Sequence, residues 1–434
     1  MIPRPKLTAM SALYLFLITQ ALSMIGSRMT AIGLGLWLFA ETGNTTPLLL
    51  TVFFTELPGM VLGSVAGALV DRAVRKWVLL LADTGLALCS LLLLASIWGG
   101  WFRVEVLYTV ALVQGLFTIL QSPAKDASLA LMIPAERRDR INGLQQMLFP
   151  FAGVVAPALA GLVYAAGGIG AVFIADFATF LVAASAILAI HVPQPKVSEE
   201  AELSNNLWQE LRIGFRYVGA ELGLFSLLLY GVVTNYLFNG SLELTVPYVV
   251  TITGSEVTTG LVFMASSLGA FLGGGIIAAR STVQRRVQWI LAGALLTATM
   301  YVLYGLVRSP WLLASALFFL MIPLPMGGAL MTSLLQTRVP AALQGRVFAL
   351  FGQLSFVGST LSFLSIGPLV DQVLEPAVGQ AGWQWVAPLV GNEAGAGMRL
   401  LMVMTGLLLA VVTLFVWLLP AVRKLDEVGD GRWE

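Results

Sequence analysis

The chain has 434 residues, of which 58% are hydrophobic and only 11% are charged, and its formal net charge is +1. Soluble domains carry about 25% charged residues, so this chain lacks the polar surface that a soluble protein of its length needs, and we expect it to lie in a lipid bilayer. The near-neutral charge and the lack of a basic block exclude a nucleic-acid-binding protein.

Apolar runs that are long enough to cross a bilayer, about 20 residues each, follow one another along the whole chain. The first half has six, near residues 10–39, 47–70, 77–98, 104–124, 141–166 and 168–190. The second half has six, near residues 223–251, 257–279, 287–307, 311–336, 346–371 and 396–420. This pattern predicts an all-α integral membrane protein with twelve transmembrane helices in two six-helix bundles. The first run is too long for the core of a cleavable signal peptide, so we expect it to be a retained helix.

The order of the runs predicts four parts of the chain. These are an N-terminal bundle over residues 1–190, a cytoplasmic linker over 191–222, a C-terminal bundle over 223–420 and a cytoplasmic tail over 421–434. Within the linker, apolar residues recur at helical spacing from Leu207 to Val218, while two arginines lie on another face. This predicts an amphipathic helix on the membrane surface.

A short charged loop separates the second and third runs. It contains Gly67, Asp71, Arg72, Arg75 and Lys76, in the pattern G-x-x-x-D-R-x-x-R-K. Because the loop is so short, the two flanking helices must run antiparallel, with the charges at the water line. A charged turn alone is weak evidence for any particular protein family, but the complete pattern at this place in the chain is specific.

The two halves of the chain share weak internal similarity. Gly26-Ser27 matches Gly240-Ser241, Arg75-Lys76 matches Arg285-Arg286, and two further pairs recur at offsets of about 206 to 214 residues. Parallel repeats of this kind are typical of transporters that are built from two related bundles.

Basic residues gather on one set of loops, which predicts the orientation in the membrane. Three of them, Arg103, Arg308 and Arg399, fall on the opposite set. The richer set holds nineteen: Arg4, Lys6, Arg72, Arg75, Lys76, Arg137, Arg138, Arg140, Lys196, Arg212, Arg216, Arg280, Arg285, Arg286, Arg338, Arg346, Arg423, Lys424 and Arg432. We therefore expect the richer set and both termini to be cytoplasmic.

The 67–76 loop resembles the loop between the second and third helices of the major facilitator superfamily. Further motifs resemble the macrolide-efflux and enterobactin-exporter branch, which consists of drug:proton antiporters: Gln20-Ala21-Leu22-Ser23, Ala82-Asp83, Ser122-Pro123-Ala124, Val155-Ala156-Pro157, Gly345-Arg346-Val347-Phe348 and Arg423-Lys424-Leu425-Asp426. The resemblance implies a conformational latch in which Asp71 acts on the eleventh helix, supported by Arg72, Arg75 and Lys76. Simple retention of positive charge on the cytoplasmic side is the alternative reading of this loop.

The fifth run contains Gly153, Pro157 and Gly161, which resemble the Gly/Pro motif of facilitator antiporters. Small residues allow tight helix packing, and a proline removes one backbone hydrogen bond. Two interpretations are consistent with this pattern. The motif either forms a tight helix contact that prevents leakage through the transporter, or serves only ordinary helix packing. One family feature is missing, because Ala111 stands where many drug antiporters carry an arginine, three residues before a Gln-Gly pair.

Charged residues inside apolar runs are costly and are candidates for function. Arg28 and Glu56 fall at similar depths in the first and second runs, so they can form an ion pair that is either proton-carrying or merely structural. Glu243, in the seventh run near Asn235 and Asn239, is a candidate for binding a proton or a cationic substrate. Asp176, early in the sixth run, is a further candidate, although the helix dipole also favours a carboxylate there.

Together these features predict a secondary exporter of amphipathic small molecules in the bacterial inner membrane, working as a monomer by alternating access and proton antiport. A siderophore or lysophospholipid transporter of the same fold, and a membrane scaffold or receptor without transport, are the alternatives. We expect no enzymatic activity, catalytic residue, metal or cofactor. The chain has no Walker loop, and its single histidine, His191, cannot provide a zinc site of the usual kind.

Overall fold

The computed structural model describes residues 9–133, 138–190, 207–280 and 283–427, and this part of the chain is helical with no strand. The chain divides into two compact units. The first consists of Met1–Thr42 and Leu50–Leu203, and the second of Gly43–Leu49 and Ser204–Glu434.

Five helices build the first unit: α1 (Ala9–Thr42), α2 (Thr46–Arg72), α3 (Arg75–Trp98), α4 (Val104–Met132) and α5 (Arg138–Ala189). The first turn of α2, up to Leu49, belongs to the second unit. The 52-residue α5 is two spans in one, because Gly168 interrupts it with φ 64° and ψ −165°. Only glycine adopts this backbone conformation readily. The sequence prediction of separate runs ending at 166 and starting at 168 agrees with this break.

Ten helices form the main body of the second unit: α6 (Leu207–Ala220), α7 (Leu222–Glu243), α8 (Thr245–Thr253), α9 (Glu256–Ala278), α10 (Arg286–Leu306), α11 (Pro310–Met321), α12 (Pro323–Arg338), α13 (Ala341–Leu369), α16 (Ala396–Leu418) and α17 (Pro420–Glu427). Two of the candidate membrane spans are broken part of the way along their length. The span of α7 and α8 breaks at Leu244, and that of α11 and α12 breaks at Ile322. Pro323 follows the second break and lacks the N–H that would continue the helix.

Eleven stretches of the described residues are long and apolar enough to cross a membrane. One of them, Phe151–Ala189, contains the break at Gly168 and therefore holds two spans. The twelve-helix prediction is thus confirmed. Each unit has its own apolar core: Leu13, Leu79 and Ile187 are buried in the first, and Leu224 and Val347 in the second.

Between α13 and α16 the chain forms a compact sequence of short turns. A π-helical turn (Val370–Leu374) is followed by α14 (Glu375–Ala377), a 3₁₀ turn (Ala381–Trp385) and α15 (Ala387–Val390). The Trp383 indole N–H donates to the Gly391 carbonyl at 2.9 Å. Glu375 accepts from the backbone N–H of Met398 at 3.1 Å, which satisfies a donor in the first turn of α16.

Charged side chains also tie this segment together. Glu393 pairs with Arg308 at 2.8 Å and with Arg399 at 3.4 Å. The pKa of the Glu393 carboxyl lies below its usual value because its own backbone N–H donates to it and because the two guanidinium groups attract its charged form. This cluster stabilises the connection between α13 and α16.

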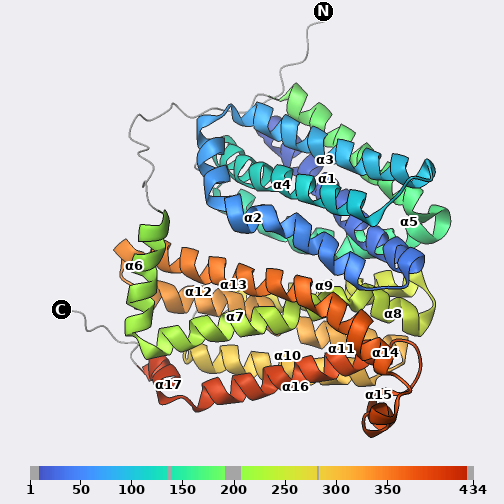
Figure 1. The fold of residues 1–434 in the computed structure, drawn as a ribbon. Coiled ribbons are helices and arrows are strands. Elements are labelled where there is room, and N and C mark those ends of the chain that lie inside the picture. Colours follow the sequence, from blue (N-terminus) through green and yellow to red (C-terminus); the bar gives the residue numbers. More distant parts are fainter. Residues whose placement is uncertain (1–8, 134–137, 191–206, 281–282, 428–434) are drawn as a thin grey trace, which may run out of the picture. The chain divides into compact units, whose positions relative to one another are not determined.

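At the opposite end of the second unit, α6 lies across the ends of α7 and α13 (Figure 1). Its Tyr217 hydroxyl donates to the Arg338 carbonyl at the end of α12, at 3.2 Å. In α17, Asp426 caps α10 by accepting from the backbone N–H groups of Val287 at 2.9 Å and Gln288 at 3.1 Å. These contacts fix the helix ends on the side that the positive charges predict to be cytoplasmic.

Candidate functional site

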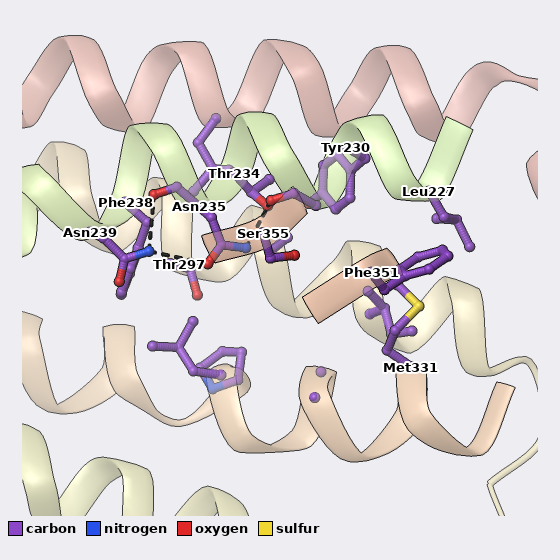
Figure 2. Close-up of a pocket in the computed structure, with 18 residues that line it drawn as sticks. Leu227, Tyr230, Thr234, Asn235, Phe238, Asn239, Thr297, Met331, Phe351 and Ser355 are labelled. Carbon is purple, nitrogen blue, oxygen red and sulfur yellow. Dashed lines mark hydrogen bonds between the residues drawn. The ribbon is translucent and has the colours of Figure 1, made fainter. Parts of the chain in front are cut away.

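The second unit contains a cavity of about 480 Å³, within the range of 300–1,000 Å³ that small-molecule sites occupy. Helices α7, α10, α12 and α13 provide most of its wall (Figure 2). The lining residues are Leu227, Tyr230, Gly231, Thr234, Asn235, Phe238, Asn239, Ile290, Ala294, Thr297, Pro323, Leu324, Gly327, Gly328, Met331, Phe351, Ser355 and Leu409.

One side of the cavity carries a row of amides on α7. The Asn235 side-chain nitrogen donates to the Gly231 carbonyl at 2.8 Å. The Asn239 side-chain nitrogen donates to the Asn235 carbonyl at 2.9 Å, to Asn235 Oδ1 at 3.1 Å and to Ser359 Oγ at 3.0 Å. The sequence prediction singled out both asparagines, and the structure brings them together on the cavity wall.

The opposite side of the cavity is apolar. It comes from α12, which begins with Pro323 after the break at Ile322 and continues with Leu324 and Met331. Gly327 and Gly328 widen the cavity there, since a Cβ atom at either position would meet nothing within 4 Å. An apolar wall that faces a row of hydrogen-bonding groups suits an amphipathic ligand.

No acidic or basic side chain lines this cavity in the described part of the chain. Glu243, the third candidate of the seventh run, lies one helical turn beyond Asn239 at the end of α7 and is half-buried. It continues the row of Asn235 and Asn239 along the helix but stays outside the lining. Its suggested role in binding a proton or a cationic substrate remains a prediction.

The first unit contains a buried carboxylate, whereas the second unit has the row of amides on α7. Asp176 of α5 is only 2% exposed. Its Oδ2 accepts from the Thr30 hydroxyl at 2.9 Å and from the Ser90 hydroxyl at 3.4 Å, so α1 and α3 both reach it. Ser27 of α1 also lies within hydrogen-bonding reach of this carboxylate. Its other oxygen, Oδ1, is buried and has no hydrogen-bond partner among the described residues.

Space for Asp176 comes from a missing side chain on α1. A Cβ atom at Gly26 would lie 2.3 Å from Thr179 Oγ1 and 2.7 Å from Asp176 Oδ1. Glycine therefore allows α1 to approach the part of α5 that follows Gly168, at the level of the carboxylate. Asp176 lies two turns after the break at Gly168, at the interface of three helices.

A second buried carboxylate, Asp83 of α3, is 1% exposed. Its Oδ1 accepts from the Gln121 side-chain amide of α4, and Lys125 of the same helix lies near enough to attract it. Unlike Asp176, it therefore has a cationic neighbour.

Arg28 and Glu56 are half-buried on α1 and α2. Gly115 of α4 packs against this turn of α2, since a Cβ atom there would lie 2.2 Å from the Thr55 carbonyl oxygen and 2.9 Å from Pro58. The ion pair between Arg28 and Glu56 remains a prediction.

The loop motif falls at the end of α2 and the start of α3. Gly67, Asp71 and Arg72 lie in the last turns of α2, and their side chains are outside the described part of the structure. Arg75 donates to the Ala127 carbonyl at 2.9 Å. Lys76 donates to the carbonyls of Leu188 at 3.1 Å and Ile190 at 2.8 Å. These two basic residues therefore bind the ends of α4 and α5 within the first unit.

The fifth-run motif lies in the first arm of α5, where Gly153, Pro157 and Gly161 are all buried. Their burial fits a role in helix packing, and the role of the motif in preventing leakage remains a prediction. Sequence reasoning missed the hydroxyl partners Thr30, Ser90, Ser355 and Ser359. Only Ser355 and Ser359, spaced by one helical turn, give a sequence signal for a shared helix face.

Comparison with known proteins places these features in context. A sequence profile of the Major Facilitator Superfamily matches residues 16–363. Macrolide efflux protein A of Streptococcus pyogenes is 23% identical over 416 residues, which are 94% of this chain and 95% of that protein. Multidrug efflux pump Tap of Mycolicibacterium fortuitum is 24% identical over 375 residues, which are 84% and 90% of the two chains.

Solved structures resemble the whole chain in fold. A bacterial homologue of the human lysosomal transporter Spinster, in an inward-facing and unoccupied conformation, superposes with a TM-score of 0.71 at 16% identity, covering 99% of each chain. A bacterial homologue of the iron transporter ferroportin has a TM-score of 0.67 at 14% identity, covering 94% of this chain and 99% of that one. At these identities the likeness concerns the fold alone.

Proposed function

The chain belongs to the Major Facilitator Superfamily and is a multi-pass membrane transporter rather than an enzyme, and from this premise we propose that it exports amphipathic small molecules in exchange for protons. The observation that carries the proposal is the cavity of the second unit. Its apolar α12 wall faces the amide row of α7, so one compound can bury an apolar face and form hydrogen bonds at the same time.

The efflux direction is supported by the relatives. Proteins named for macrolide efflux and multidrug efflux align with nearly the whole chain. Macrolides are large, amphipathic and rich in oxygen, which matches a cavity with both kinds of wall. We therefore propose that this protein shares its class of cargo with these efflux proteins, and that the residues lining its cavity determine which compound it prefers.

We propose that Asp176 in the first unit carries the coupled proton. A carboxylate that is buried in a membrane bundle with no cation beside it is costly in its charged form. Uptake of a proton removes that cost, and movement of α1 or α3 changes the hydroxyls that stabilise the charge. Glu56, Arg28 and Glu243 remain further candidates for the same step.

We propose that the protein lies in the bacterial inner membrane with both termini in the cytoplasm. The distribution of nineteen basic residues against three supports this orientation. In this frame, the loop that contains Asp71 is cytoplasmic, and its role as a latch in alternating access is part of the proposal.

The experiment that tests the function is transport by purified protein in proteoliposomes. Erythromycin accumulation is measured with an imposed pH gradient and after the gradient is dissipated by nigericin. We expect accumulation that requires the gradient. Erythromycin movement that is independent of the gradient would contradict proton antiport, and the absence of transport for erythromycin and for every other amphipathic compound tested would contradict export of this cargo class.

A further inference from the structure

The orientation of the Asn239 amide is fixed by a chain of hydrogen bonds that begins at a backbone carbonyl. The Gly231 carbonyl can only accept, so the nitrogen of the Asn235 side chain must face it. The Asn235 oxygen then faces Asn239, whose nitrogen donates to it at 3.1 Å. If the Asn239 amide were reversed, its oxygen would oppose two acceptors of Asn235, which is unfavourable.

This arrangement leaves the Asn239 oxygen as an acceptor at the cavity. Figure 2 shows the nitrogen turned toward Asn235 and the oxygen turned away from it. None of the described residues donates to this oxygen. The Ser355 hydroxyl, which also lines the cavity, has no hydrogen-bond partner in the same part of the structure. The cavity therefore offers one fixed acceptor and one hydroxyl that can donate or accept.

The surroundings select against a charged ligand group. The lining contains no carboxylate that could neutralise an ammonium ion and no basic group that could neutralise an anion, within the part of the chain that the structure describes. Transfer of an unpaired charge from water into such a site is costly. An uncharged donor, by contrast, satisfies the Asn239 oxygen without this penalty.

From these observations we propose that the cavity binds an uncharged, hydroxyl-bearing part of the cargo, with Asn239 accepting from a cargo hydroxyl and Ser355 completing the recognition. Any cationic part of the same cargo lies outside this cavity. The inference rests on the proposed export function and adds the chemical class of the group that is recognised. It assigns a specificity role to Ser355, which the sequence did not suggest.

The test compares two amphipathic probes that differ in the chemistry of recognition. Erythronolide B is an uncharged macrolactone with several hydroxyl groups, and tetraphenylphosphonium is a hydrophobic cation without a hydrogen-bonding group. Half-saturating concentrations for both are measured in proteoliposomes for the wild type, Asn239→Leu and Ser355→Ala. Ser355→Ala removes only one oxygen, so it remains informative if Asn239→Leu does not fold.

Ser365→Ala is the matched control. It lies on the same helix, α13, but does not line the cavity. Its hydroxyl donates to the Leu361 carbonyl at 2.8 Å and lies 3.0 Å from the Tyr236 hydroxyl, which also stays outside the lining. We expect it to leave the ratio of the two half-saturating concentrations unchanged. In each cavity variant we expect this ratio, erythronolide B over tetraphenylphosphonium, to rise roughly three- to tenfold, as the loss of one hydrogen bond predicts.

The outcomes separate the inference from the function on which it rests. If the wild type transports neither these probes nor erythromycin, the proposed export function is wrong. If it transports the cation or erythromycin but not erythronolide B, or if the ratio in Ser355→Ala stays at the wild-type value, export stands and the recognition of an uncharged hydroxyl group is wrong.

Discussion

In the first unit, α1 meets the sixth span of its bundle at a carboxylate, and in the second unit the corresponding helices meet at two hydroxyls. Ser27 and Thr30 approach Asp176, whereas the Ser241 and Thr405 hydroxyls lie 2.9 Å apart. A glycine precedes each serine, Gly26 in one unit and Gly240 in the other. The two glycines pack differently, because Gly26 lies against Thr179 and Asp176 of the sixth span, whereas Gly240 lies against Ser362 of α13. The contact between the first and last spans of each bundle therefore differs in whether it holds an ionisable group.

This difference suggests a division of labour. The first unit places carboxylates out of water, at Asp176 and Asp83. The second unit has neutral amides and hydroxyls around its cavity. A duplicated bundle can keep its packing while one copy carries a proton and the other recognises an uncharged group of the cargo.

The largest expected effect comes from removing the charge in the first unit. With a gradient of about two pH units and one proton per cargo, coupling supports up to about a hundredfold accumulation, since each pH unit is worth 1.36 kcal/mol. Asp176→Asn should reduce accumulation to about the equilibrium level while cargo still crosses down its own gradient. Asp176→Glu, which keeps the carboxyl, should restore part of the coupling. Gradient-driven accumulation by Asp176→Asn would show that another group carries the proton.

Substitution of Gly26 or Gly240 by alanine tests whether the helix contacts of the two units have different roles. A Cβ atom at Gly26 would crowd Thr179 and Asp176, and one at Gly240 would lie 2.4 Å from Ser362 Oγ. Each substitution should cost about 1–3 kcal/mol of stability, seen as a lower thermal unfolding temperature in detergent. Only Gly26→Ala should also weaken proton coupling.

Gly231→Ala provides the control for these two variants. Its Cβ atom would lie 3.7 Å from Ser355 Oγ, an ordinary contact, so stability should not fall. Equal loss of coupling in Gly26→Ala and Gly240→Ala would argue against a special role for the Asp176 contact.

Removing the hydroxyl pair of the second unit should have a smaller effect. Thr405→Val loses the contact with Ser241, and such bonds in membrane bundles are worth about 0.6 kcal/mol. We expect a slight decrease in thermal stability and unchanged dependence on the pH gradient. A Thr405→Val variant with lost coupling would mean that the two corresponding contacts serve one function.

The smallest effect concerns the exposed acid of the second unit. The folded protein holds the pKa of Glu393 below its ordinary value of 4.5. Its stabilising contribution is therefore present above that value and is lost as the pH falls through the lowered pKa. Thermal unfolding of the wild type and Glu393→Gln should differ slightly at neutral pH, and the difference should disappear as the pH falls through the lowered pKa. A difference that grows on acidification would contradict the role of the Arg308 and Arg399 contacts.

The fold could be read from the sequence because the bilayer imposes a long apolar run on each span. The predicted run 77–98 corresponds to Arg75–Trp98, and 104–124 begins where α4 begins. The prediction ended this helix too early, since α4 continues past Lys125 and Asp126 to Met132. The breaks at Leu244 and Ile322 were missed because both lie inside long apolar runs, although Pro323 marks the second one.

The candidate site was only partly predictable. Asn235 and Asn239 stand four residues apart, so their common helix face is visible in the sequence. The surroundings of Asp176 are not, because Thr30 lies 146 residues away in the chain and Ser90 lies 86 away. The helix dipole explains a carboxylate at Asp176 from α5 alone, whereas in the structure Asp176 is buried against α1 and α3 as well. Contacts between distant helices, which a single sequence does not encode locally, made the difference.

The most direct test of the division of labour is proton release on cargo binding, measured with a pH indicator in weakly buffered detergent solution. Saturating cargo should displace protons from the wild type. It should displace the same number of protons from Asn239→Leu, although a higher cargo concentration is needed to saturate this variant. Asp176→Asn should bind cargo and release none. Release from Asp176→Asn equal to that of the wild type would contradict the assignment of the proton to the first unit.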